Sequence, residues 1–123
     1  MNLGQCHNFS DFRTLAKKRL PGPIFHYIDG AADDEVTYKR NSQSFNDVDL
    51  VPNVLAGVEE VDMSTKIMGQ ELSMPFYCAP TALQRLFHHE GERAVAKAAS
   101  SAGTMFGVSS LATVTVEDIA KIS

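Results

Sequence analysis

The chain has 123 residues, of which 44% are hydrophobic and 21% charged, a composition that suits one small globular domain with its own core. Its formal net charge of -4 provides no basic excess to neutralise phosphates, which argues against a general nucleic-acid binder. The two cysteines, Cys6 and Cys78, form no C-x-x-C pair, so we expect free thiols in a reducing compartment and no thiolate metal site.

The first 46 residues predict three helices. Ser10 is a good N-cap for a helix that Pro21 stops. Pro23 suits the first position of a second, short helix, which ends at Gly30. Asp33 can cap a third helix that runs to about Phe45.

An acidic stretch, PIFHYIDGAADDEVT at residues 23–37, lies across the second and third of these helices. A calcium loop requires a glycine at its sixth position, and counting from Asp29 that position is Asp34. We therefore expect no metal site here. The helix dipole favours Asp34 and Glu35 in the first turn of the third helix. The roles of the acids do not explain why a tyrosine, Tyr27, stands one turn before the helix end at Gly30.

The middle of the chain predicts extended structure. Residues 47–64 read as a connector with short strands. The following segment, TKIMGQELSMPFYCAP, predicts a hairpin that turns at Gly69 and Gln70. The apolar run 76–79 then predicts a strand covered on both faces, which ends at Pro80.

The last third alternates between strand and helix. Residues 90–102 are rich in alanine and predict a helix that Gly103 closes, and TMFGVSS is the next short strand. Thr115 to Asp118 offers a capping-box-like start for a final helix. This alternation predicts an α/β architecture with parallel strands. Residues 98–116 lack charge, but nearly half of them are Ser, Thr or Gly, so they make a poor membrane span.

Ligands of parallel α/β folds gather at the carboxyl ends of the strands. Two such ends are visible, and both are small and hydroxyl-rich: residues 80–84 (PTALQ) and residues 109–113 (SSLAT). These residues suit the close approach of backbone to a flat ligand or an anion. Alternatively, their hydroxyl groups simply cap the helices that follow. The residue pattern by itself leaves both readings open.

Four blocks resemble a known family in order and spacing: LP…FHYIDGAADDEVT, SMPFYCAPTALQ, HHEGERAVAKAASSAGT and SSLATVTVEDIA. They look like the N-terminal part of the FMN-dependent 2-hydroxy acid dehydrogenases and oxidases, and the motif FHYIDG looks closest to the bacterial L-lactate dehydrogenases. The resemblance covers residues 9 to 123. It implies a TIM barrel with an N-terminal helical cap, of which this chain would supply the cap (1–46), a connector and hairpin (47–75) and about two of the eight βα units (76–123).

The same resemblance implies roles for six residues. Tyr27 matches the tyrosine whose phenol donates a hydrogen bond to the substrate carboxylate. Leu111 matches a pocket position that varies with substrate size, and that is a tryptophan in glycolate-oxidising relatives. Pro80, Thr81 and Ala82 match the segment beneath the flavin ring, and Ser109 matches a serine that hydrogen-bonds FMN. These four are the implied cofactor-binding residues.

The family's other catalytic and binding residues are expected beyond this chain. They comprise a Q-L-Y segment, an arginine pair, a lysine and a base histidine in an S-N-H-G-x-R-type loop. The four histidines present, which stand outside any such loop, are expected at helix boundaries and on the surface: His7, His26, His88 and His89. A TIM barrel needs about 200 residues or more. We therefore expect an incomplete barrel, inactive alone, that derives from a truncated, partial or split gene.

Two functional readings remain at this stage, besides a remnant without function. The resemblance implies FMN-dependent oxidation of a lactate-like L-2-hydroxy acid by the intact enzyme, with an unknown electron acceptor. The intact enzyme would be a homo-oligomer, or would need a complementary chain. We expect it in the cytoplasm or peripherally on the inner face of the plasma membrane, since the N-terminus lacks a signal-peptide pattern. The alternative is a non-catalytic α/β module that binds an anion or a protein through Ser109 and Thr81.

Overall fold

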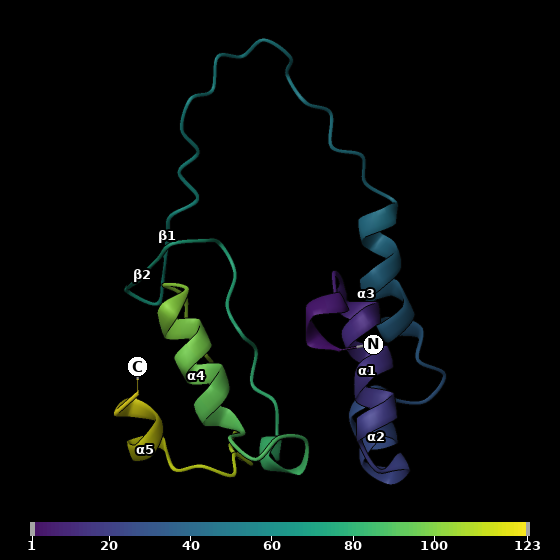
Figure 1. The fold of residues 1–123 in the computed structure, drawn as a ribbon. Coiled ribbons are helices and arrows are strands. Elements are labelled where there is room, and N and C mark those ends of the chain that lie inside the picture. Colours follow the sequence, from purple (N-terminus) through teal and green to yellow (C-terminus); the bar gives the residue numbers. More distant parts are fainter. Residues whose placement is uncertain (1, 123) are drawn as a thin grey trace. The chain divides into compact units, whose positions relative to one another are not determined.

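The computed structural model describes residues 2–122, which form two compact units that divide between Gly57 and Val58. The first unit contains a 3-10 helix and three α-helices, drawn in purple to blue in Figure 1: η1 (Leu3–Gln5), α1 (Phe9–Arg19), α2 (Gly22–Asp29) and α3 (Val36–Asn46). The second unit contains a hairpin, a 3-10 helix and two α-helices: β1 (Thr65–Ile67), β2 (Gln70–Leu72), η2 (Gln84–Leu86), α4 (Glu92–Ser101) and α5 (Val116–Ala120). The three predicted N-terminal helices are thus confirmed.

The start of α1 differs from the prediction. The N-cap is Asn8 and not Ser10, because the Asn8 side chain accepts a hydrogen bond from the Asp11 amide at 3.0 Å. The Asp11 carboxylate in turn accepts from the His7 amide at 2.9 Å. The first bond satisfies an amide that a helix start leaves unpaired, the second ties down the residue before the cap, and together they fix the first turn two residues earlier than Ser10 would.

The starts of α2 and α3 are also corrected. Pro23 is the second residue of α2, after Gly22. The N-cap of α3 is Glu35 and not Asp33, and no side chain caps this helix. Both Asp33 and Glu35 have positive φ, so the acids form the turn before α3 and lie outside its first turn.

An ion pair joins α1 to the end of α2. Arg13 donates to both oxygens of Asp29, from Nε at 2.5 Å and from Nη2 at 2.8 Å. This bidentate bond is the main reason that the pKa of Asp29 lies below its usual range. Beside it, Leu15 and Phe25 are the buried apolar side chains of the two helices. Asp29 therefore ties α2 to α1, which the sequence analysis did not anticipate.

The connector and hairpin partly agree with the prediction. Residues 47–64 contain no strand, although short strands were predicted there. The hairpin is confirmed, with Thr65 opposite Leu72, but it turns at Met68 and Gly69. Both have positive φ, as a two-residue hairpin turn requires, and Gln70 already belongs to β2.

The two predicted core strands meet in one parallel bridge between Cys78 and Phe106. The Cys78 amide donates to the Met105 carbonyl at 3.0 Å, and the Gly107 amide donates to the Cys78 carbonyl at 2.9 Å. The parallel direction is confirmed. Full burial of the first strand is wrong, because Phe76 is 62% exposed: in the part of the chain that the structure describes, this segment pairs with a single neighbour.

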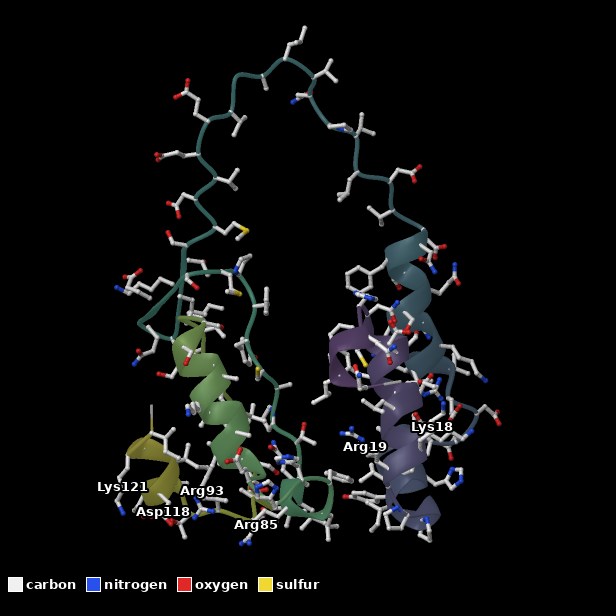
Figure 2. The ribbon with its side chains drawn as sticks, viewed as in Figure 1. Lys18, Arg19, Arg85, Arg93, Asp118 and Lys121 are labelled. Atoms are coloured by element: carbon white, nitrogen blue, oxygen red, sulfur yellow. The ribbon has the colours of Figure 1, made fainter. Side chains whose placement is uncertain are left out.

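Helices α4 and α5 enclose the small core of the second unit. Ala96, Val114 and Ile119 form this core, with Phe106, Val108 and Ile122 packed against it. Gly103 follows α4 with φ +63, which confirms the predicted helix end. Thr115 caps α5 through the Asp118 amide, as predicted. On the surface, Asp118 of α5 binds Arg93 of α4 at 3.5 Å and Lys121 at 3.0 Å, three labelled side chains in Figure 2.

Among residues 2–122, no helix combines the length and apolar character needed to cross a membrane.

Candidate functional site

The two predicted strand-end loops lie side by side in the second unit. The Leu83 amide donates to the Leu111 carbonyl at 3.1 Å, and the Arg85 amide donates to the Thr113 hydroxyl oxygen at 3.3 Å. Leu83 has φ +54, a left-handed conformation that turns the chain into η2. The structure therefore brings the predicted cofactor segment 80–82 and the predicted residues Ser109 and Leu111 into one small region.

The backbones of the two strands approach closely just before these loops. A Cβ atom added to Gly107 would lie 2.9 Å from Cγ and Cδ of Pro80, closer than such contacts are found. Glycine is therefore needed at this position for the approach. Pro80 and Thr81 are exposed, whereas Ala82 and Ser109 are partly covered. The strand ends thus present a surface of small side chains.

The hydroxyl groups of this region divide between structure and surface. The Ser109 hydroxyl oxygen accepts from the Leu111 amide at 3.1 Å in a tight turn, which leaves its proton able to donate to a ligand. Thr115, two residues beyond the second loop, caps α5, whereas no side chain caps η2 after the first loop. Leu111 is 61% exposed beside Ser109. An aliphatic side chain next to a donor suits a ligand with an apolar part and an oxygen acceptor.

Glu92 is a buried carboxylate that the sequence analysis missed. It is 0% exposed, and it accepts from the Thr113 amide at 2.8 Å and from the Thr113 hydroxyl at 2.6 Å. A signal for it was available, because Glu92, Ala96 and Ala99 recur at helical spacing and all three are buried. The apolar face of α4 therefore continues onto this acid.

The pKa of Glu92 lies below its usual value as the result of opposed effects. Burial is the largest single effect and raises the pKa, because it penalises the charged form, but the hydrogen bonds to the carboxylate, led by those from the Thr113 side chain and amide, together outweigh it. Backbone amides of Glu92 itself and of Gln84 act in the same direction. The ionised carboxylate thus joins the start of α4 to both strand-end loops.

Tyr27 belongs to the first unit, in the last turns of α2. Its side chain is 57% exposed. Asp29, two residues further on, is held by Arg13 as described above. Tyr27 is therefore an accessible phenol on a helix whose end is fixed to α1.

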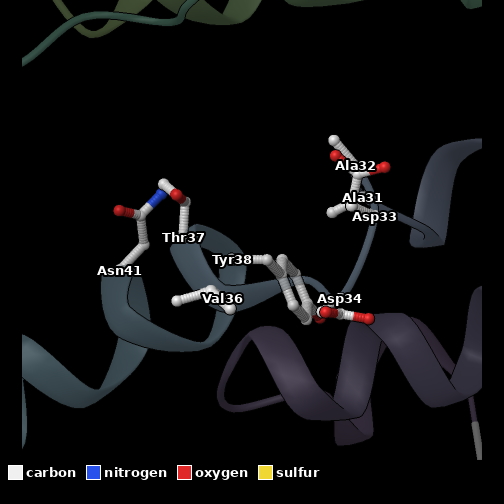
Figure 3. A pocket seen from close by; sticks show the side chains of 8 residues that line it. All are labelled: Ala31, Ala32, Asp33, Asp34, Val36, Thr37, Tyr38 and Asn41. Carbon is white, nitrogen blue, oxygen red and sulfur yellow. The ribbon is translucent and has the colours of Figure 1, made fainter.

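The acidic turn borders an open pocket, which Figure 3 shows lined by eight residues from Ala31 to Asn41. Asp33 and Asp34 lie at its edge, with Tyr38 beside Asp34. Over residues 2–122, no three His, Cys, Asp or Glu side chains come together as metal ligands. The four histidines are exposed, as expected, and the His88 and His89 rings lie 4.4 Å apart.

Comparison with known proteins now defines the class. Residues 16–123 match the family model described as FMN-dependent dehydrogenase. Glycolate oxidase 1 of Oryza sativa subsp. indica is 40% identical over 118 residues, which are 96% of this chain and 32% of that protein. A protein of Mycobacterium tuberculosis named "Putative L-lactate dehydrogenase" is 42% identical over 117 residues, 95% of this chain and 28% of its own length.

Solved structures agree with this class. Mandelate oxidase superimposes with a TM-score of 0.86 at 35% identity, over 93% of this chain and 33% of that one. A Y128F mutant of mandelate oxidase with a C4a-OH-FMN adduct gives the same TM-score and identity, over 92% of this chain and 34% of its own. These neighbours are TIM-barrel flavoproteins, and the unclosed parallel pair 78/106 is consistent with part of such a barrel.

The chain belongs to the FMN-dependent dehydrogenase family, whose members oxidise 2-hydroxy acids with FMN as cofactor. It spans about a third of the length of the curated relatives it matches.

The strand-end region fits one part of a flavin site. A flat ring system needs backbone and small side chains on one side, which the close approach of Gly107 to Pro80 and the small residues Thr81 and Ala82 provide. The Ser109 hydroxyl can supply a hydrogen-bond donor.

Proposed function

We propose that this chain supplies the substrate tyrosine and part of the flavin surface of an enzyme that oxidises a lactate-like L-2-hydroxy acid. Besides the family match, the supporting observation is the junction of the two strand-end loops, where Leu83 binds Leu111 directly. We use the term complete protein for residues 1–123 together with the rest of the barrel, in one polypeptide or two.

Each residue would have a distinct task in the complete protein. FMN, when bound, accepts the hydride equivalent that the hydroxy acid gives up. Residues 80–82 would lie against the flavin, and Ser109 would donate a hydrogen bond to it. Tyr27 would donate its phenol proton in a hydrogen bond to the substrate carboxylate, which holds the acid in one orientation. The base, the arginines and the electron acceptor would come from outside residues 1–123.

Leu111 would set the size of the substrate. It is exposed at the strand-end region, and it is smaller than the tryptophan expected in glycolate-oxidising relatives. We therefore infer that lactate or longer 2-hydroxy acids are accepted at least as well as glycolate, although glycolate oxidases are among the relatives at 40% identity.

A substrate panel tests this function. The complete protein, loaded with FMN, is mixed without oxygen with glycolate, L-lactate and longer L-2-hydroxy acids, and the loss of oxidised-flavin absorbance is timed. We expect lactate or a longer acid to reduce the flavin at least as fast as glycolate, and Leu111→Trp to shift the preference towards glycolate. A strong preference of the unmodified protein for glycolate would contradict the assignment of Leu111. No reduction by any of the acids would contradict the function itself.

A non-catalytic module that binds an anion or a protein through Ser109 and Thr81 is the second candidate. The observation in its favour is that Thr81 is exposed and Ser109 only partly covered. A protein that binds an anion but neither takes up FMN nor oxidises any 2-hydroxy acid would support it.

A further inference from the structure

The buried carboxylate of Glu92 has a role that the proposed catalytic chemistry does not require. It lies in the first turn of α4 with no exposed surface, and the amide and hydroxyl groups of Thr113 that donate to it are neutral. Burying a charge without a cationic partner is costly unless hydrogen bonds satisfy its oxygens. The surroundings of Glu92 are therefore built to hold an anion at this place.

The donors to Glu92 come from both strand-end loops. Thr113, in the loop after the second strand, provides its amide to Oε1 and its hydroxyl to Oε2. The amide of Gln84, in the loop after the first strand, also stabilises the ionised form. The Thr113 hydroxyl oxygen accepts from the Arg85 amide at 3.3 Å, which links the two loops a second time through the same side chain.

The backbone beside Glu92 is shaped for this contact. Gly91 is buried with φ +52, and a Cβ atom there would lie 2.6 Å from Cγ and 3.2 Å from the amide nitrogen of Arg85. Only glycine lets the start of α4 approach residue 85 so closely. Residues 84–85, the start of α4 and Thr113 thus converge on one carboxylate.

The loops that Glu92 joins carry the proposed flavin-binding residues. Gln84 lies two residues after Ala82, and Thr113 lies four residues after Ser109. We propose that Glu92 is a positioning residue, whose buried carboxylate holds the two strand-end loops together so that residues 80–82 and Ser109 form one preorganised surface for FMN. This inference rests on the proposed function.

Preorganisation has a defined consequence for binding. If the two loops moved independently, FMN would have to order them when it binds, and its affinity would fall accordingly. A residue that only supports the fold would lower the stability of the protein and leave the FMN affinity of the folded molecules unchanged. The two roles are thus separable by experiment.

The test compares Glu92→Gln with Ile119→Val in the complete protein. Gln keeps the shape of the side chain but replaces one acceptor oxygen with an NH2 group, which cannot accept from the Thr113 hydroxyl. Ile119→Val removes one methyl group from the core of the same unit and serves as a control for lost stability. FMN affinity is measured by quenching of flavin fluorescence, and loop mobility by hydrogen exchange at the amides of Leu83, Arg85 and Thr113.

A second pair of variants covers the case in which Glu92→Gln fails to fold. Thr113→Val removes the hydroxyl group that links Glu92 to the Arg85 amide, whereas Thr113→Ser keeps it. We expect Glu92→Gln and Thr113→Val to weaken FMN binding about tenfold or more and to speed exchange at the three amides. Thr113→Ser should restore near-normal binding, and Ile119→Val should leave the affinity unchanged.

The outcomes distinguish this inference from the proposed function. Normal FMN affinity in Glu92→Gln and Thr113→Val, with an unmodified protein that binds FMN, would overturn the inference alone. Equal losses in Thr113→Val and Thr113→Ser would also overturn it. An unmodified complete protein without FMN affinity would overturn the proposed function and, with it, this inference.

Discussion

Single residues already show how the acids of this chain are used. Asp29 binds Arg13 and fixes the end of α2, Asp33 and Glu35 form a turn with positive φ, and Glu92 is buried. Acids that look equivalent in the stretch 29–35 therefore differ in role, since Asp29 forms an ion pair whereas Asp33 and Glu35 shape a turn. Each role depends on a partner elsewhere in the chain, such as Arg13, or on a backbone conformation that the local sequence does not reveal.

Tyr27 carries the first prediction at this scale. In the complete protein, Tyr27→Phe would remove the proposed hydrogen bond to the charged substrate carboxylate, and such a bond is worth about 1.5 to 3 kcal/mol. We expect kcat/KM for the 2-hydroxy acid to fall roughly ten- to hundredfold. Steady-state kinetics measure this, with Tyr38→Phe as the control from α3, which should behave as the unmodified protein. Unchanged kinetics in Tyr27→Phe would remove this residue from the site.

The ionisation of Glu92 predicts how stability depends on pH. Its pKa is lowered in the folded protein, so its contribution to stability is present above the unfolded value of about 4.3 and is lost as pH falls through the lower folded value. Urea unfolding of the complete protein between pH 7 and acid should show this loss. In Glu92→Gln, the free energy of unfolding should depend less on pH over the same range. Identical slopes in both proteins would show that the carboxylate is not ionised in the folded state.

At the scale of elements, the sequence predicts the type of each helix well, but it misplaces the starts of the N-terminal helices and locates that of α5 correctly. Periodic apolar residues and the glycines at 30 and 103 identify α1, α2, α4 and their ends. The start of α1 was missed because Asn8 and Ser10 are both good caps, and only the reciprocal bond from Asp11 selects Asn8. The hairpin turn was misplaced because Met68 is an unusual residue at positive φ.

The junction of α4 with the hairpin gives a prediction for a glycine. Gly103 and Gly57 both have φ +63, but a Cβ atom at 103 would lie 3.0 Å from Ser73 Oγ, whereas nothing lies within 4 Å at 57. Ser73 also binds the Gly103 carbonyl through its amide at 2.8 Å. Gly103→Ala should therefore destabilise the complete protein by about 2 to 3 kcal/mol, and Gly57→Ala by about 1 kcal/mol or less. Chemical denaturation measures both, and equal losses would mean that Ser73 gives way without cost.

The sequence predicts those parts of the candidate site that lie within one short segment, and it does not predict the contacts between segments. The blocks around residues 80–82 and 109–111 mark two strand ends, and the structure places these ends together. Glu92 could not be assigned a role, because its partners Thr113 and Gln84 come from two other loops. Contacts of this kind appear only when the chain folds back on itself.

At the scale of the whole molecule, many apolar side chains of the second unit and the connector face solvent. Phe76 is 62% exposed and Leu55 fully so, and Leu50 is 93% exposed. The strand around Cys78 pairs with one neighbour only, as far as residues 2–122 show. Unpaired edges and exposed apolar residues favour aggregation or association with further chain. These exposed apolar residues are consistent with a part of a barrel whose surface other strands and helices would cover.

The visible absorption spectrum of purified protein tests the central claim most directly, that these residues form part of an FMN site which needs the rest of the barrel. Residues 1–123 are expressed alone and, in parallel, together with a chain that supplies the remaining barrel. We predict that the chain alone is poorly soluble, colourless and inactive towards 2-hydroxy acids, and that the complete protein carries the flavin spectrum. A soluble, monomeric and FMN-loaded preparation of residues 1–123 alone would contradict this account.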